Sequence, residues 1–182
     1  MKKIIFSAAI LLSSTAIFAQ SDNVQPNVVK LNPLGALFGS ANLGFEHAFN
    51  EKSSVVILPS FGMLKSSGFK YTTYGIGAEY RLYFTGTAPR GTYVAPGLSA
   101  QFGTAKVEGS EGGANEKTNI SGFSAKVVIG HQWIWNSGFT LDLNGGVQYV
   151  DFSFKDKTGD FAGQNALSGI LPALSFSIGY NF

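Results

Sequence analysis

The chain has 182 residues, of which 13% are charged and 14% are aromatic, and it contains 23 glycines and no cysteine. The charged fraction is about half that of ordinary soluble proteins, and the aromatic and glycine content favours sheet and turns over helix. The lack of cysteine excludes disulfides, thiolate nucleophiles and thiolate metal ligands, and the length suits a single domain.

The first 19 residues have the three regions of a secretory signal peptide. Lys2 and Lys3 precede the apolar run IIFSAAILL, and small residues lead to a predicted cleavage after Ala19. A retained membrane anchor is disfavoured because this run is shorter than the roughly 20 residues that span a bilayer. After cleavage the chain has eleven basic and eleven acidic residues, which argues against a basic surface for nucleic acid.

Beyond residue 27, apolar and polar residues alternate with period two in segments that are separated by turn-like sequences. No apolar helix stripe and no run of 18 apolar residues occurs, which disfavours a helical membrane protein. The pattern predicts strands over residues 28–38, 41–49, 54–64, 73–84, 92–106, 120–135, 138–154 and 170–182.

Each predicted strand has one face of bulky apolar side chains and one face of small polar ones. In ANLGFEHAF, for example, Leu43, Phe45 and Phe49 share a face that is opposite to Gly44 and Glu46. Alternation by itself also fits a secreted soluble β-protein, whose polar face would meet water and carry many Lys and Glu residues. Here the polar face is mostly Gly, Ser, Asn, Gln and Ala, which predicts a lumen lining with lipid on the apolar face.

Four prolines and one change of phase interrupt this pattern. Pro33, Pro59, Pro96 and Pro172 fall inside predicted strands, although proline cannot donate to a ladder. We expect local irregularity at Pro59 and Pro96 without a change of topology. Over Tyr149–Phe152 the apolar phase moves from odd to even positions, for which a β-bulge is the simplest explanation.

Aromatic side chains gather at one end of the predicted strands. Girdles of this kind stand at the water–lipid interfaces of membrane barrels. The predicted interface aromatics are Phe49, Phe84, Trp133, Trp135, Phe139, Tyr180 and Phe182.

The chain ends in LSFSIGYNF, a strictly alternating strand that closes on an aromatic residue. With the signal peptide and the eight segments, this strand resembles that of the small eight-stranded outer-membrane barrels of Gram-negative bacteria. VVKLNPLGALFG, NLGFEHAF and FSIGYNF are further similar to an uncharacterised family of such barrels. The resemblance implies a terminal strand that is read by the barrel-assembly machinery through Phe176, Ile178, Tyr180 and Phe182.

The fold that follows is all-β, an eight-stranded antiparallel up-and-down transmembrane β-barrel over residues 28–182. Its expected location is the outer membrane, among outer-membrane lipid, and residues 20–27 are expected to form a short periplasmic segment. NEKSS (50–54), TGTAPRG (85–91) and NSG (136–138) are then short periplasmic turns. The segments 38–40, 65–72, 107–119 and 155–169 lie outside, and the last two are the natural place for a surface interaction, with no ligand indicated.

The sequence offers little for catalysis. Some eight-stranded outer-membrane barrels are lipid-A acylases or deacylases, and a deacylase resemblance requires a His with a Ser two residues later. His131 is followed by Gln132 and Trp133, and His47 by Ala48 and Phe49, so neither matches. We therefore expect no enzyme, no cofactor and no metal, with a lipid-modifying enzyme kept as the alternative.

The same alternation sends six charged side chains inward, three positive and three negative. Eight strands enclose an interior just wide enough for side chains to fill, so the charges are expected to pair and to plug the lumen. A narrow channel with a charged lining is the competing possibility. The predicted function is a structural or cell-surface role, and the predicted ionic network comprises Lys30, Glu46, Glu79, Arg81, Lys126 and Asp142.

Overall fold

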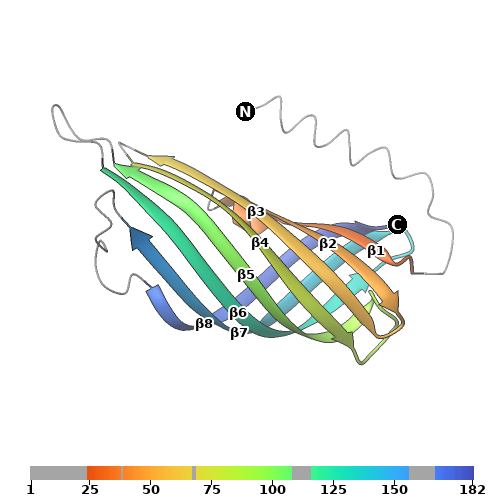
Figure 1. Cartoon of the computed structure of the whole chain (residues 1–182). Helices are drawn as coiled ribbons and strands as arrows, with labels where there is room; N and C mark the ends of the chain where they lie inside the picture. The colour runs from red at the N-terminus through yellow and green to blue at the C-terminus, as the bar shows by residue number, and fades with distance from the viewer. Residues whose placement is uncertain (1–23, 38, 67–68, 108–115, 156–166) are drawn as a thin grey trace.

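The computed structural model describes residues 24–37, 39–66, 69–107, 116–155 and 167–182 (Figure 1). The predicted signal peptide 1–19 and the middle of each long predicted loop lie outside these residues.

Eight antiparallel strands follow one another around the barrel in sequence order, and β1 closes it by pairing with β8 (Figure 1). The predicted fold class is confirmed. Among the described residues, no helix is long and apolar enough to cross a membrane. The strands are β1 (Asn27–Asn32), β2 (Ser40–Asn50), β3 (Ser53–Ser66), β4 (Phe69–Tyr83), β5 (Gly91–Val107), β6 (Glu116–Ile134), β7 (Phe139–Lys155) and β8 (Leu167–Asn181).

The barrel has two distinct ends. The turns β2–β3, β4–β5 and β6–β7 lie at the same end as the C-terminus, and we call this the termini end. The connections β3–β4, β5–β6 and β7–β8 lie at the opposite end, called the hairpin end. Because successive side chains of a strand alternate between faces, bulky side chains such as Ile76, Leu98 and Val127 point outward and are more than half exposed.

The predicted first strand, 28–38, is wrong in its second half. β1 stops at Asn32, and the helix α2 (Pro33–Leu37) follows. Proline suits the first position of a helix because its fixed φ is already helical and its missing N–H leaves no donor unpaired there. The Asn32 Oδ1 accepts hydrogen bonds from the Leu34 and Gly35 backbone N–H groups at 2.9 and 3.3 Å, as an N-cap residue does.

The predicted outer loops are too long. β3 and β4 remain paired as far as Lys65↔Lys70 and Ser66↔Phe69, so the predicted loop 65–72 is mostly strand. Residues 116–119 belong to β6, and residues 167–169 to β8. Polar composition suggested loops there, but the backbone pairing continues beyond the part of each strand that has a bulky apolar face.

The irregularities expected at Pro59 and Pro96 are present and local. The β2–β3 ladder passes from Asn42↔Ser60 to Phe45↔Ile57 in unchanged register, and the β4–β5 ladder passes likewise from Glu79↔Gly97 to Leu82↔Val94. Each interruption lies opposite a proline, which has no N–H to donate.

The β-bulge expected at Tyr149–Phe152 is wrong. β7 keeps one register with β6 and with β8 throughout this stretch, and Val150 is buried inside the barrel. The apolar phase changes because Phe152 fills lumen space beside Gly122, where even a Cβ would overlap its ring. The register shift lies instead in β2, between Ala48 and Asn50.

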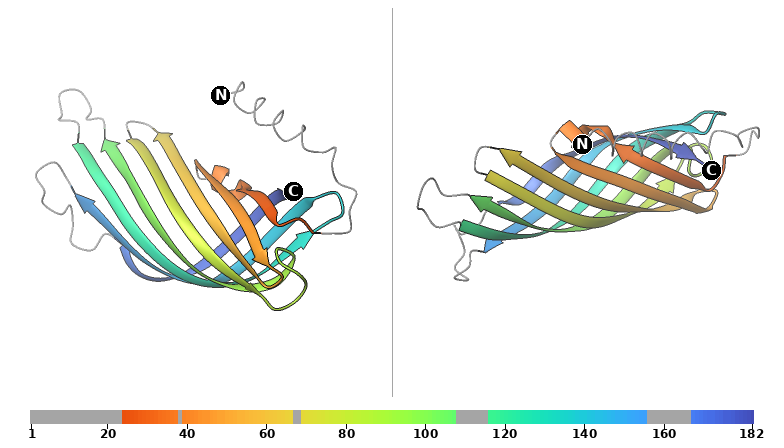
Figure 2. Two further views of the ribbon diagram at one scale, coloured as in Figure 1. Left: turned by 45° about the vertical axis from the view of Figure 1, so that its right-hand side comes forward. Right: turned by 90° about the horizontal axis from the view of Figure 1, so that it is seen from above.

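β1 is much shorter than the strand with which it pairs. Its pairing with β8 runs only from Val28↔Asn181 to Leu31↔Ile178. Among the described residues, positions 167–177 of β8 therefore pair with β7 alone. Figures 1 and 2 show β1 confined to the termini end while β8 runs along the barrel, and we call the unpaired stretch the seam.

Candidate functional site

Charged side chains from three sides of the barrel converge in the lumen near the termini end. Lys30 of β1 places its Nζ 2.6 Å from Glu46 Oε2 on the neighbouring strand and 2.8 Å from Asp142 Oδ2 on β7. All three side chains are buried. A single ammonium group therefore joins two carboxylates from opposite parts of the sheet.

Arg81 of β4 reaches the same two carboxylates from another side. Its Nη1 lies 2.7 Å from Asp142 Oδ2 and 3.4 Å from Glu46 Oε2. Its Nη2 lies 3.0 Å from Glu79 Oε2, and its Nε donates to the same oxygen at 3.1 Å. The planar guanidinium group holds its donors in a fixed geometry, so the Arg81 side chain can bind three carboxylates at once. A lysine ammonium on its flexible stem would hold the same partners in a less fixed geometry.

Lys126 completes the network on the side nearer the hairpin end. Its Nζ lies 2.6 Å from Glu79 Oε1, and its side chain keeps 23% exposure. Gly97 makes room for this pair, because a Cβ there would stand 3.0 Å from Glu79 Cγ and 3.1 Å from Lys126 Cε. The structure thus brings all six sequence-predicted network residues into contact, in a set whose formal charge is zero.

Neutral side chains complete the hydrogen bonds of the charged ones. The Gln132 Oε1 accepts from Lys30 Nζ at 2.8 Å and from Arg81 Nη1 at 3.2 Å. Tyr83 and Ser54 hydroxyls donate to Glu46 Oε1 at 2.7 and 2.5 Å. Among the described residues, every buried side-chain nitrogen or oxygen has a partner, which a buried ionic cluster requires.

Tyr93 is the central residue that charge-based reasoning missed. Its hydroxyl donates to Asp142 Oδ1 at 2.6 Å and accepts from Asn144 Nδ2 at 3.2 Å. Its ring lies under the Arg81 guanidinium, with 4.1 Å between Cζ and the ring centroid. Because the bulky apolar Val94 is predicted to point outward, alternation along the strand places the neighbouring Tyr93 inward. The sequence therefore did contain the information that identifies Tyr93 as a lumen residue.

Alternation along the strands also points Tyr83, Gln132, Asn144 and Gln148 into the lumen, which predicts them as neutral hydrogen-bond partners of the network. Tyr83, Gln132 and Asn144 have that role. Gln148 instead lines the cavity described below.

The β4–β5 turn packs against the charged layer at the termini end. Ala88 and Pro89 are buried, and the Ala88 N–H donates to the Glu51 carbonyl at 2.8 Å. Gln132 Nε2 donates to the Pro89 carbonyl at 2.6 Å, which ties this turn to the charged layer. We call the six charged residues, Gln132, the two tyrosines and this turn the ionic plug.

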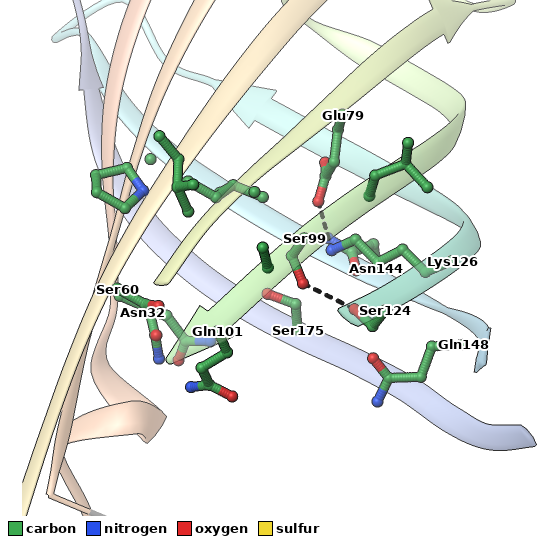
Figure 3. Close-up of a pocket in the computed structure, with 18 of the residues that line it drawn as sticks. Asn32, Ser60, Glu79, Ser99, Gln101, Ser124, Lys126, Asn144, Gln148 and Ser175 are labelled. Atoms are coloured by element: carbon green, nitrogen blue, oxygen red, sulfur yellow. Dashed lines mark hydrogen bonds and ion pairs between the residues drawn. The ribbon is translucent and has the colours of Figure 1, made fainter. Parts of the chain in front are cut away.

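Between the ionic plug and the hairpin end the lumen holds a cavity of about 440 Å³. Figure 3 shows Ser60 on one side of it and Gln148 on the opposite side, with Gln101 and Ser175 between them and the Glu79–Lys126 ion pair nearby. The Ser99 and Ser124 hydroxyls lie 2.7 Å apart on its wall. The interior is therefore filled by side chains at the ionic plug and open between the plug and the hairpin end, where polar side chains and charged residues of the plug line the cavity.

Comparison with known proteins places the chain in a family. A family model described as "Protein of unknown function (DUF3575)" matches residues 6–165. The chain belongs to this family. No curated protein sequence matches significantly.

Two crystal structures of Acinetobacter baumannii proteins are similar to this DUF3575 member. CarO has a TM-score of 0.47 at 11% identity, covering 90% of this chain and 100% of CarO. CarO2 has a TM-score of 0.46 at 11% identity, covering 88% of this chain and 100% of CarO2.

The predicted interface aromatics lie on the exterior of this DUF3575 barrel, near the termini end. Six of the seven are exposed, and Tyr180 is intermediate. Pairs of rings are in contact, with centroids 5.3 Å apart for Trp135 and Phe139. In the terminal strand, Phe176 and Ile178 share the outward face with Tyr180, and the Phe182 N–H donates to the Asn27 carbonyl at 2.9 Å.

Neither histidine lies in the lumen. His131 Nδ1 is 2.8 Å from Thr92 Oγ1, and its ring lies 4.4 Å from that of Trp133. His47 Nδ1 is 2.8 Å from Asn27 Oδ1. Within the described part of the chain, no group of three His, Cys, Asp or Glu side chains is placed to hold a metal ion.

Proposed function

We propose that this protein is a non-enzymatic outer-membrane β-barrel whose lumen is closed to through passage, with a structural or cell-surface role. The observation that carries the proposal is the ionic plug. A solute crossing the barrel would have to separate Arg81 from Asp142 and Lys30 from Glu46, and removing one partner of such a buried pair typically costs about 3–5 kcal/mol.

The distribution of apolar side chains supports the membrane location. Bulky apolar residues cover the outside, as with Phe61, Ile76 and Ile129, whereas buried positions hold charges such as Glu46 and Arg81. A soluble protein rarely exposes so continuous an apolar surface. Lipid as the solvent of this surface explains both the apolar outside and the polar inside.

The placement of the histidines supports a role without catalysis. His131 points outward beside Trp133 and bonds to Thr92, and neither contact is with a carboxylate. An imidazole held between a hydroxyl and an aromatic ring suits the headgroup region, where amphipathic rings are stable. A surface role would use the predicted loops 107–119 and 155–169, whose middle parts lie outside the described residues.

Recording from planar bilayers tests the closed lumen. We expect the purified mature chain to give no stable conductance step. A variant that lacks one charge pair of the plug, Glu46→Ala with Arg81→Ala, is expected to give small conductance steps. The two substitutions open polar space in the plug while its formal charge stays zero. Migration on unheated gels shows whether each protein is folded, and stable steps from the unchanged chain would contradict the proposal.

A further inference from the structure

The cavity beside the ionic plug opens toward the seam. Its lining includes Asn32 and Asn42 of β1 and β2 on one side of the seam. It also includes Leu171 and Ser175 of β8 on the other side. We propose that this cavity binds the neutral, polyhydroxylated headgroup of a membrane amphiphile, which enters sideways through the seam.

The seam exists because β1 is short. At Pro33 the chain leaves the sheet and enters α2, whereas β8 extends eleven residues further toward the hairpin end, positions 167–177. α2 contacts β2 and β8 but does not replace the missing ladder. The outward side chains of this edge include the most exposed bulky apolar residues of the described chain, with Leu174 at 85% and Ile170 at 77%. An acyl chain lying along this edge would cover them.

The chemistry of the lining selects a neutral ligand that both donates and accepts hydrogen bonds. Five side chains that line the cavity make no hydrogen bond to any part of the chain that the structure describes: Ser60, Gln101, Gln148, Ser175 and Ser177. Hydroxyl and amide groups offer donors and acceptors together, as the hydroxyls of a sugar do.

The charges at the cavity are already balanced. Lys126, which is the most exposed cation of the network, is held at 2.6 Å from Glu79, and the six network charges sum to zero. An anionic or cationic headgroup would therefore find no unpaired opposite charge. The cavity volume of about 440 Å³ lies within the range of ligand sites, roughly 300–1,000 Å³.

The amphiphile part of this inference rests on the proposed membrane location, whereas the closed lumen is tested separately by bilayer recording. The test uses the full mature chain in polyoxyethylene micelles, with the side-chain amide resonances of Gln101 and Gln148 as the readout. Three probes are titrated: dodecyl maltoside, dodecylphosphocholine with the same chain but a zwitterionic headgroup, and free maltose with the same headgroup but no chain.

We expect saturable shifts of both amides with dodecyl maltoside, none with dodecylphosphocholine, and at least tenfold weaker binding of maltose. Equal binding of maltose would keep the polyhydroxyl site but overturn the lipid source and the side entry. No saturable shift with dodecyl maltoside, or an equal shift with dodecylphosphocholine, would overturn the site itself.

Variants separate the site from general effects of the micelle. Gln101→Leu and Gln148→Leu are each expected to weaken binding about fivefold, the effect of one lost hydrogen bond, and the remaining amide serves as the readout. Asn136→Leu likewise replaces a side-chain amide by leucine, but at an exposed turn, and should leave binding unchanged. Should a leucine variant not fold, Ser60→Ala and Ser175→Ala remove only a hydroxyl, and unchanged binding in both would count against the site.

Discussion

Glu46 shows how much of the ionic plug depends on one side chain. It is fully buried, and its two oxygens receive Lys30, Arg81, Ser54 and Tyr83. Because four donors are aimed at one carboxylate, the loss of its charge leaves two cations facing a neutral group in a buried site.

Glu46→Gln is therefore expected to lower the free energy of unfolding by about 3 kcal/mol, near the lower end of the cost of breaking a buried pair. Glu51→Gln, the same change at an exposed turn, should stay within about 0.5 kcal/mol of the unchanged chain. Urea unfolding in micelles measures both. Equal stability of the two variants would show that the cluster contributes nothing through Glu46.

Alternation along the strands was sufficient to place the six charges in the lumen. Successive side chains of a strand point to opposite faces, and the bulky apolar ones take the outer face. It did not indicate how the lumen is filled. Some neutral partners such as Gln132 were expected, but Tyr93 and Ser54 were missed because alternation does not mark which neutral side chain reaches a charge. Pro89 was missed because a turn residue has no strand parity. Which side chain bonds to a buried charge depends on distances across the lumen. The residue pattern of a single strand contains no information about those distances.

At the scale of elements, β8 and β1 decide how the barrel closes. The ends of both strands meet through the Asn181 amide, which donates to the Gln25 and Asn27 carbonyls at 2.6 and 2.9 Å. Only four positions of each strand pair across this closure. The last contact is that of the Phe182 N–H with the Asn27 carbonyl, so the terminal residue belongs to the closing ladder.

Deletion of Phe182 is expected to reduce the amount of inserted barrel more than it reduces synthesis or export. The deletion removes an outward aromatic and one bond of the closing ladder, and, on the proposed assembly role of the terminal strand, part of the signal for the assembly machinery. Pulse-labelled cells report synthesis, signal cleavage and insertion separately. Trp135→Ala, which removes an aromatic at the same end, serves as the control, and insertion of the deletion variant at the normal rate would refute the assembly role.

Element boundaries were predicted well where bulky apolar residues alternate with small polar ones, and poorly elsewhere. The strand predicted over 28–38 failed because Pro33 and the Asn32 cap form a helix start, a local signal that overrides alternation. The loop predicted over 65–72 failed because Lys70 and Thr72 are polar at positions where the other strands have bulky apolar residues, although the backbone there stays paired.

At the scale of the whole molecule, the orientation follows from the placement of short turns and long connections. The termini end has the short turns, and the hairpin end has the connections through 108–115 and 156–166. In membrane barrels the short turns face the periplasm. The proposed location therefore places the hairpin end at the cell surface.

A protease site inserted between Gly112 and Gly113 is expected to be cut by protease added to intact cells. The same site between Asn136 and Ser137 should stay intact until the envelope is permeabilised. Immunoblots of the two insertions, made in parallel, report both the location and the orientation. Protection of both sites in intact cells would contradict a surface-exposed hairpin end, and cleavage of only the second would reverse the orientation.

The balance of charge in the ionic plug has an electrical consequence. Moving one elementary charge through 100 mV changes its energy by about 2.3 kcal/mol, and this is the lever by which voltage moves gating segments in channels. Three cations and three anions bound together carry no net charge, so moving them as one body through a uniform field does no work. An electric field across the envelope consequently exerts no net force on the plug as a unit, and it could act on the plug only by pulling its opposite charges apart.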